Sequence, residues 1–441
     1  MDGMTTAEGD LLALAEAVRD EDPVCLSCLG RLVADRSFGL TNDARGRALR
    51  ITVALTEDVP FEPPDATACW VCEGHAAEVE TWAERVVDSL DGIEFATYQV
   101  GCRVPPLLEE NDRLLRESIG LDADAGESLK RELNREVGKR VGAMTETTVD
   151  FDRADVVALL HLERGTVETR INPAFIYGRY RKCERDIPQT EWPCRDCGGE
   201  GTQLGAEGPE PCDGCDGTGY RYDVSVEGLT VPHAVDAMDG SEGVFHGAGR
   251  EDVDARMLGT GRPFVMEVKD PKRRRPDLDT LERQINEEAD DMVEVEGLTF
   301  ATHDMVERVK GLEASKRYRA EVSFAEPISD EAFTSAIEQL DGAIVEQYTP
   351  NRVDHRRASL TREREVYTCE GTLDSSTTAI IEVHGAGGLY IKELISGDEG
   401  RTKPSLAGVL GIDATVTALD VLAVEGEDEP FATDEMLVDP A

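Results

Sequence analysis

The chain has 441 residues, enough for two or three domains with cores of their own. Its 91 acidic and 46 basic residues give a net charge of −45, yet 40% of the residues are hydrophobic, which excludes a disordered acidic chain. This pattern indicates a proteome adapted to molar salt, where screening within about 3 Å makes net charge a poor guide to the partner. We expect no membrane span of roughly 20 apolar residues and no secretory leader, and therefore a cytoplasmic protein.

Two cysteine pairs near the N-terminus form the first candidate metal site. An amphipathic helix is expected from Thr5 to Arg19, and the CxxC pairs Cys25, Cys28, Cys69 and Cys72 follow it. Four thiolates are the closed tetrahedral set of structural zinc, and cysteines in a reducing compartment more often bind metal than pair. We predict a zinc-binding region over residues 1–77. Free thiols or a redox motif are the alternative, although a redox motif usually needs a single pair.

Residues 78–171 combine a basic helix with a small sheet. Ser128 is expected to cap a helix with an apolar residue at every fourth position, and residues 156–162 and 166–171 to form a hairpin. The remaining helix surface carries Lys130, Arg131, Arg135, Lys139 and Arg140. The combination resembles a THUMP domain, an RNA-binding module. The alternative is a solvated helix face.

The next stretch adds candidate RNA contacts and a second cysteine set. Between Pro173 and Thr190, Tyr180 is interleaved with Arg179, Arg181 and Lys182, as in many RNA contacts. The insertion at 192–220 then holds Cys194, Cys197, Cys212 and Cys215 in a C-x2-C-x14-C-x2-C spacing. It is similar to the zinc region of J-protein chaperones, but only two repeats are present and the His-Pro-Asp tripeptide is absent. We expect at least one structural zinc in the protein, and this set offers a place for another.

The stretch from His246 to Val268 joins a glycine-rich approach to an acidic turn and a strand. Gly247 and Gly249 allow a tight backbone path, and residues 264–268 alternate as a strand that enters the core. Asp252 lies between them, at a junction of loop and strand. A carboxylate held there by a rigid sheet suits a nucleophile or a general base.

The string GREDVDARMLGTGRPF in this stretch resembles the Arg-x-Asp catalytic motif of the pseudouridine synthases. In particular it is similar to the archaeal and eukaryotic tRNA pseudouridine synthases that modify T-loop uridines 54 and 55, here from a haloarchaeal source. The resemblance implies that Asp252 is the catalytic nucleophile, that Arg250 assists base flipping, and that Asp254 is a neighbour.

Two later motifs follow in the order expected for that family. Lys316-Arg-Tyr318-Arg-Ala320 resembles the second motif, in which Tyr318 would stack on the target base. Tyr390-Ile-Lys392 resembles the third motif, in which Tyr390 would line the uridine pocket and Lys392 would pair with the catalytic aspartate. Arginine is common at this last position, so lysine supplies a point charge without bidentate geometry.

The C-terminal part holds two further basic stretches and an acidic tail. Lys272 to Arg275 form a basic loop, and residues 349–367 hold the densest basic run: Arg352, His355, Arg356, Arg357, Arg362 and Arg364. We interpret the run as facing phosphate, with a solvated charged strand as the alternative. A final helix and strand are expected up to Val424, and the acidic tail 425–441 is expected to be disordered.

These observations predict an α+β (mixed α/β) protein. A pseudouridine synthase catalytic domain with a mixed, mainly antiparallel sheet would span 172–424, after the zinc-binding and THUMP-like regions. The expected function is isomerisation of uridine 54 or 55, or both, in tRNA by a monomer without a catalytic cofactor. A non-catalytic zinc and THUMP RNA-binding protein is the main alternative. A THUMP-linked methyltransferase or thiolation enzyme fits poorly, because no suitable nucleotide-binding loop is present.

Overall fold

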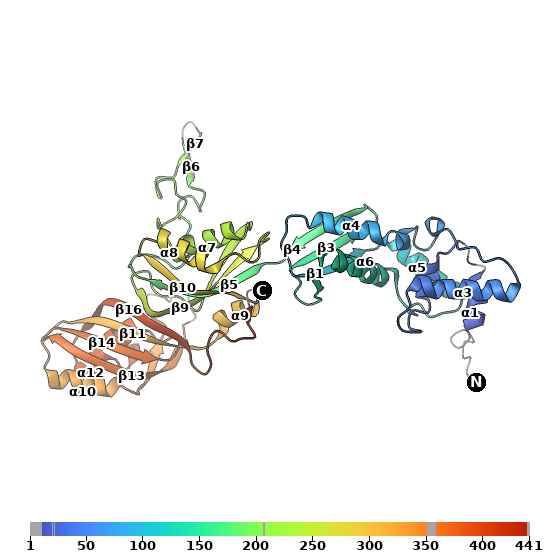
Figure 1. The fold of residues 1–441 in the computed structure, drawn as a ribbon. Coiled ribbons are helices and arrows are strands. Elements are labelled where there is room, and N and C mark those ends of the chain that lie inside the picture. Colours follow the sequence, from blue (N-terminus) through green and yellow to red (C-terminus); the bar gives the residue numbers. More distant parts are fainter. Residues whose placement is uncertain (1–10, 20, 22, 206–207, 351–358, 439–441) are drawn as a thin grey trace, which may run out of the picture. The chain divides into compact units, whose positions relative to one another are not determined.

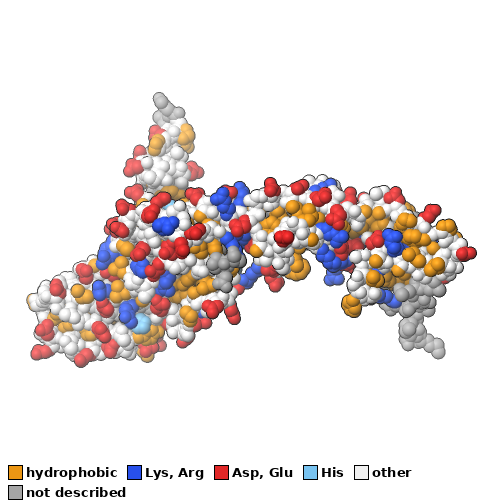
Figure 2. Space-filling view, in the orientation of Figure 1, with side chains coloured by type: hydrophobic (Ala, Val, Ile, Leu, Met, Phe, Trp, Pro, Cys, Tyr) orange, Lys and Arg blue, Asp and Glu red, His pale blue; other side chains and the backbone are white. Residues whose placement is uncertain are grey.

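The protein is described from a computed structural model, which covers residues 11–19, 21, 23–205, 208–350 and 359–438. The chain divides into two compact units, Met1–Asn172 and Pro173–Ala441, both drawn in Figure 1. Figure 2 shows aspartate and glutamate spread over the visible face of the chain rather than gathered in one patch. Within the described ranges, no helix has the length and apolar character needed to cross a membrane.

The first unit packs helices against a four-stranded sheet of order β2-β1-β3-β4. Strand β1 is parallel to β2 and β3, and β3 and β4 form the predicted antiparallel hairpin. The elements are α1 Leu11–Arg19, α2 Leu26–Arg31, α3 Asn42–Glu57, α4 Val79–Ser89, β1 Thr97–Arg103, α5 Pro106–Ser118, α6 Leu129–Thr145, β2 Thr148–Val149, β3 Val156–His161 and β4 Thr166–Ile171, with short 3-10 turns at Ala66–Ala68 and His75–Ala77. The Ser128 side chain caps α6 by accepting from the Arg131 backbone N–H, as predicted.

The cysteine-rich part and the basic helix α6 share one hydrophobic core, which extends from Leu14 to Leu162. A buried charge network also joins them. Arg31 is fully buried and pairs with Asp112 at 2.6 Å and with Glu132 of α6 at 3.1 Å. Because an unpaired buried charge is costly, these pairs tie α2 to α5 and α6. The described part of residues 11–77 therefore packs with residues 78–171 as one body.

The second unit is built on an eleven-stranded sheet of order β15-β12-β13-β14-β11-β16-β9-β5-β10-β17, with β8 paired to β9. Among the described strands, β16 and β9 form the parallel pair and the other pairs are antiparallel, so the predicted mixed, mainly antiparallel sheet is confirmed. The strands are β5 Ala174–Lys182, β8 Glu242–Gly247, β9 Arg256–Lys269, β10 Val293–Ala301, β11 Ala314–Phe324, β12 Ile344–Tyr348, β13 Thr361–Ser375, β14 Thr378–Gly385, β15 Thr402–Lys403, β16 Ala414–Gly426 and β17 Leu437–Val438.

Helices and one projecting hairpin complete this unit. The helices are α7 Val226–Ala237, α8 Leu278–Glu288, α9 Asp304–Gly311, α10 Asp330–Leu340, α11 Ile391–Ser396 and α12 Leu406–Leu410, with a 3-10 turn at Asp398–Gly400. The insertion carries the hairpin of β6 Thr202–Gly205 and β7 Gly208–Pro211, which pair only with each other among the described strands and stand away from the large sheet (Figure 1).

The acidic C-terminal segment is ordered as far as Val438, so the prediction of disorder is wrong for residues 425–438. Strand β17 pairs with β10, and Phe431 is buried in the core. The Arg308 guanidinium donates to the Phe431 carbonyl at 2.7 Å and pairs with Glu429 at 3.1 Å. The segment covers the edge strand β10, whose backbone groups would otherwise be left open. Charge and proline content alone did not reveal these local partners.

Candidate active site

The three sequence motifs of the second unit meet at one cavity. Arg250 and Asp252 come from the loop before β9, Tyr318 from β11, and Tyr390 and Lys392 from the start of α11. All five line a cavity of 410 Å³, together with Trp192, Glu251, Lys316 and other residues of β9 and β16. A nucleobase with part of its ribose fits this volume, which lies within the usual range for small-ligand sites.

The cavity lies at the parallel seam between β9 and β16. Asp420 of β16 pairs with Arg256 at 2.7 Å and with Arg185 at 2.7 Å. Burial alone would raise the pKa of Asp420, but the two guanidiniums outweigh it and hold this pKa below its usual range. These pairs secure the first residue of β9, and therefore the end of the loop that carries Asp252.

A buried charge lies directly beneath Asp252. The neighbouring Glu251 side chain is fully buried and pairs with Arg262 at 2.9 Å and with Lys182 at 3.9 Å. The Tyr180 hydroxyl donates to the same carboxylate at 2.9 Å. Burial raises the pKa of Tyr180 well above its usual value, and Glu251 raises it further, so this phenol stays a hydrogen-bond donor. Glu251 therefore anchors the loop of residues 248–255, which we call the Asp252 loop.

The same buried residues also hold the loop backbone. Lys182 donates to the carbonyls of Asp252 and Val253 at 3.3 and 3.1 Å. Arg262 donates to the Ala248 carbonyl at 2.7 Å, and Gln189 donates to the Gly249 carbonyl at 3.0 Å. Burial lowers the pKa of Lys182 although Glu251 opposes this shift. The loop is thus held along its length by donors from β5, β9 and the segment after β5.

This network corrects the interpretation of Tyr180 and its neighbours as RNA contacts. Strand alternation along β5 turns Tyr180 and Lys182 inward, where both are fully buried. The other two cations pair with carboxylates, Arg179 with Glu425 at 2.9 Å and Arg181 with Glu294 at 3.0 Å. In this strand, the aromatic residue interleaved with cations belongs to the buried network that holds the loop of residues 248–255. Strand periodicity was the signal that could have shown this.

Above the network, Asp252 and Asp254 share one cation. The Lys392 ammonium lies 3.4 Å from an Asp252 oxygen and 2.8 Å from an Asp254 oxygen. The Asp252 side chain is 34% exposed, so its carboxylate can be reached from the cavity. The structure thus places the predicted cation beside Asp252 and adds that Asp254 competes for it at a shorter distance.

The two cavity tyrosines are held in different ways. Burial raises the pKa of Tyr318 to about 12, with Arg262 opposing and Asp252 adding to the shift, so this ring is a neutral phenol near neutral pH. It can stack or donate a hydrogen bond, and it is a poor base. Tyr390 precedes α11, and its backbone N–H donates to the buried Gln347 amide at 2.9 Å, which donates back to the Tyr390 carbonyl at 2.9 Å.

Arg250 lies against an aromatic side chain that the sequence reasoning missed. Its guanidinium carbon lies 4.8 Å from the centre of the Trp192 ring. Trp192 stands at the neck of the cysteine-containing insertion, two residues before Cys194. Nothing in the local sequence linked it to a motif that lies more than fifty residues later.

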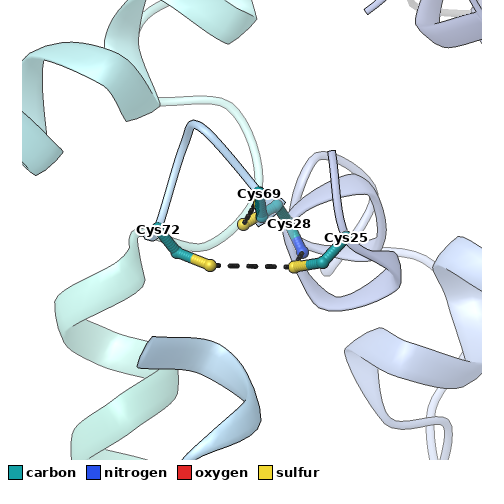
Figure 3. Close-up of side chains that lie close together, drawn as sticks. All are labelled: Cys25, Cys28, Cys69 and Cys72. Atoms are coloured by element: carbon teal, nitrogen blue, oxygen red, sulfur yellow. Dashed lines mark hydrogen bonds between the residues drawn. The ribbon is translucent and has the colours of Figure 1, made fainter. Parts of the chain in front are cut away.

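Both predicted cysteine sets are brought together. The first comprises Cys25, Cys28, Cys69 and Cys72, and the second Cys194, Cys197, Cys212 and Cys215; within each set the sulfur atoms lie within 4.8 Å of one another. In the first set, Cys25 and Cys72 are 3.8 Å apart and Cys28 and Cys69 are 3.7 Å apart (Figure 3). Thiolates at about 2.3 Å from a tetrahedral ion would be separated by about 3.8 Å. Each set could therefore hold a metal ion.

Backbone amides help to fix the sulfur atoms of the second set. The N–H groups of Gly201 and Gly219 donate to the sulfur atoms of Cys197 and Cys215 at 3.3 and 3.2 Å. Both glycines have positive φ, and a side chain on either would meet backbone atoms at 2.5 Å. The glycines are thus required for the turn around the sulfur atoms. Two cysteines outside the sets are buried, and burial raises the pKa of Cys102 and of Cys369 to about 12.

The two basic stretches predicted to contact RNA differ. On α6, Arg135 pairs with Glu127 at 2.7 Å, Lys139 with Glu136 at 3.1 Å and Arg140 with Glu80 at 2.8 Å. On β13, Arg362 and Arg364 have no carboxylate partner among the described residues and contact Thr349 and backbone carbonyls. Four residues of that run, Arg352, His355, Arg356 and Arg357, lie outside the described residues.

Comparison with known proteins gives two family models that match this chain. One, described as "Pus10, C-terminal", matches residues 175–425, and the other, "Pus10 THUMP domain, archaeal", matches residues 82–161. The chain is 61% identical to the "tRNA pseudouridine synthase Pus10" of Halorubrum lacusprofundi, over 97% of this chain and 99% of the relative. It is 42% identical to the protein of that name from Methanothrix thermoacetophila, over 95% of each chain. A solved Cbf5-Nop10-Gar1 complex overlaps 45% of each chain at 16% identity and a TM-score of 0.29, too low to support an argument.

Proposed function

Because this chain belongs to the Pus10 family, we propose that it is a tRNA pseudouridine synthase that isomerises uridine 54, uridine 55 or both in the T-loop. The observation that carries the proposal is the meeting of Asp252, Tyr318 and Lys392 around one cavity, although they are distant in the sequence. The substrate is a tRNA that the enzyme meets in the cytoplasm.

In this proposal Asp252 is the nucleophile. The target nucleotide first leaves its stack, at a cost of a few kcal/mol. The carboxylate then attacks C1′ of the ribose, and the C1′–N1 bond breaks with its electron pair on the base. After the base has turned, C5 attacks C1′ and releases the carboxylate. Loss of the C5 proton and gain of a proton at N1 complete the isomerisation without any net change in atoms.

The other cavity residues have supporting roles in this sequence. Tyr318, a neutral phenol, stacks on the freed base and keeps it from leaving while it turns. Lys392 balances the negative charge of Asp252 and also draws Asp254 to the site. Arg250 enters the space in the RNA from which the uridine has moved. The buried Glu251 network keeps the nucleophile in place while these neighbours move.

The two cysteine sets fit structural zinc in this proposal. Four sulfur donors at tetrahedral spacing are the ligands that zinc prefers, and none of the eight cysteines lines the cavity. Zinc there would stabilise the fold and supply no chemistry to the reaction. Elemental analysis of the purified protein tests this directly: the expected result is zinc in the preparation, lost from each set when its cysteines are replaced by serine. A preparation with no metal and all thiols titratable would contradict it.

The catalytic proposal is tested by tritium release from tRNA that carries labelled hydrogen at C5 of uridine, at molar salt. Asp252→Asn keeps the shape of the side chain and removes the nucleophile, so release should cease while tRNA binding persists. Residual release above a few per cent of the wild-type rate would refute the role of Asp252. A wild-type protein that binds tRNA without releasing tritium would favour the non-catalytic RNA-binding alternative.

A further inference from the structure

The neck of the cysteine-containing insertion forms a small cluster of aromatic and cationic side chains beside the cavity. Trp192 packs edge to face against Tyr222 at 5.5 Å between ring centres, and the Arg221 guanidinium lies 5.5 Å from each ring. The Arg221 backbone N–H donates to the Trp192 carbonyl at 2.8 Å. Next to it, the Glu191 N–H donates to Glu227 of α7 at 3.0 Å. These contacts give the Trp192 ring a defined place at the edge of the cavity.

Arg250 contacts an aromatic ring rather than a carboxylate. Arg250 has no ion pair within the described residues, and its guanidinium lies over the Trp192 ring instead. The acidic residues that follow it in sequence are engaged elsewhere, since Glu251 pairs with Arg262 and Asp252 with Lys392. Arg250 is exposed, lines the cavity and adjoins the residues proposed to carry out the reaction.

A stacked tryptophan suits a side chain that must be held and then released. A carboxylate partner would neutralise the charge of the Arg250 guanidinium, and the proposed role of Arg250 requires that charge for contact with the RNA. Its attraction would also be screened in molar salt, where charges interact only within about 3 Å. A cation over a tryptophan face is a short-range contact, and its stabilisation is small enough to be reversed when a better site becomes available. Holding the long side chain in one orientation also reduces the entropy lost when it enters the RNA.

We propose that Trp192 is a positioning residue for Arg250: it holds the guanidinium at the cavity mouth in the free enzyme and releases it when the target nucleotide leaves its stack. This inference rests on the proposed function, because it assumes that Arg250 enters the space left by the flipped uridine. Under this proposal the insertion of residues 192–220 contributes to the reaction through Trp192 at its neck, in addition to any stability that a bound metal provides.

A double-mutant cycle under single-turnover conditions, with the full-length protein at molar salt, tests the proposal. Trp192→Ala should lower the rate by up to about 30-fold, the range that the entropy of ordering one long side chain converts to, with little change in tRNA affinity. Trp192→Phe keeps an aromatic face and should recover much of the rate. In an Arg250→Ala background, Trp192→Ala should have no further effect, because the contact is already lost. Equal effects in both backgrounds would overturn the proposal and show that Trp192 acts independently of Arg250.

A second readout does not depend on turnover. The emission of Trp192, taken as the difference between wild type and Trp192→Phe, should change when saturating tRNA draws Arg250 away. In Arg250→Ala the emission should already differ, and tRNA should change it little. The proposal would be overturned if the Trp192 emission did not change when tRNA was added, or if it changed equally in the wild type and in Arg250→Ala. If the wild type formed no pseudouridine at all, the proposed function would fail on its own, and the emission would still report whether Trp192 and Arg250 interact.

Discussion

The two sides of the Asp252 loop are held in opposite ways. On the buried side, Glu251 is enclosed by Arg262, Lys182 and Tyr180, and donors from neighbouring strands bind the loop carbonyls. On the open side, the partner of Arg250 among the described residues is the face of Trp192, and Lys392 is shared by the carboxylates of Asp252 and Asp254. The difference indicates that the position of Asp252 depends on its buried neighbour Glu251, while the exposed groups that we propose act on the RNA are held by weak, reversible contacts.

The largest effect is expected on stability, when the ion pairs on the buried side of the loop are removed. Glu251→Ala would leave the charges of Arg262 and Lys182 buried without a partner, so we expect a loss of about 3–5 kcal/mol in the free energy of unfolding. Denaturant titration at constant salt measures it. Glu251→Gln, which keeps the shape, is the matched variant and should also lose activity through misplacement of Asp252. A protein of unchanged stability in both variants would show that the network does not hold the loop.

On the open side, Lys392→Ala should lower the rate on the order of a hundredfold, because the charge of Asp252 is no longer balanced in the cavity. Lys392→Arg should retain much of the rate, since a guanidinium can face the same two carboxylates. Single-turnover tritium release with both variants measures the effect. Equal activity of the alanine variant and the wild type would remove Lys392 from the mechanism.

The Tyr318 phenol predicts a pH effect on stability. Its pKa is raised to about 12 in the folded protein, above the value of about 10 in an unfolded chain. The neutral phenol therefore contributes stability that is complete below pH 10 and is lost as the pH rises from about 10 to 12, amounting to roughly 2–3 kcal/mol. Unfolding curves of wild type and Tyr318→Phe should diverge over this window, with the smaller loss in the variant. Parallel curves would contradict the assignment.

The smallest effect is expected for Asp254, although it lies nearest to Lys392. Its side chain is 61% exposed, and exposed ion pairs contribute at most about 1 kcal/mol. Asp254→Asn should thus change the rate by no more than about fivefold, in contrast to Asp252→Asn. If Asp254→Asn lowered the reaction rate more than Asp252→Asn did, Asp254 and not Asp252 would be the nucleophile.

Short-range patterns in the sequence predicted the parts of the site that depend on them. The cysteine spacings, the Ser128-capped helix and the alternation around Tyr318 are each encoded within a few residues or by a repeated spacing. The three family motifs identified the cavity residues because each carries its own signature. The structure then brought Arg250, Asp252, Tyr318, Tyr390 and Lys392 to one cavity, which no local pattern could show.

Features that depend on distant partners were not predicted. Glu251 was not singled out among the many acidic residues, because its partners lie about seventy residues earlier and eleven residues later. On α6, carboxylates from the same unit pair with Arg135 and Arg140, and the sequence did not reveal these ion pairs. In a chain with twice as many acids as bases, the informative cations are those without an acidic partner, and pairing is visible only in three dimensions.

The central claim is that Asp252, held from below by Glu251, isomerises uridine in the T-loop of tRNA. Mapping pseudouridines in unmodified tRNA after incubation with the protein at molar salt tests it most directly. The account predicts pseudouridine at position 54, 55 or both with the wild type, and at neither position with Asp252→Asn. A tRNA left unmodified by the wild type, or modified equally by the variant, would contradict the account.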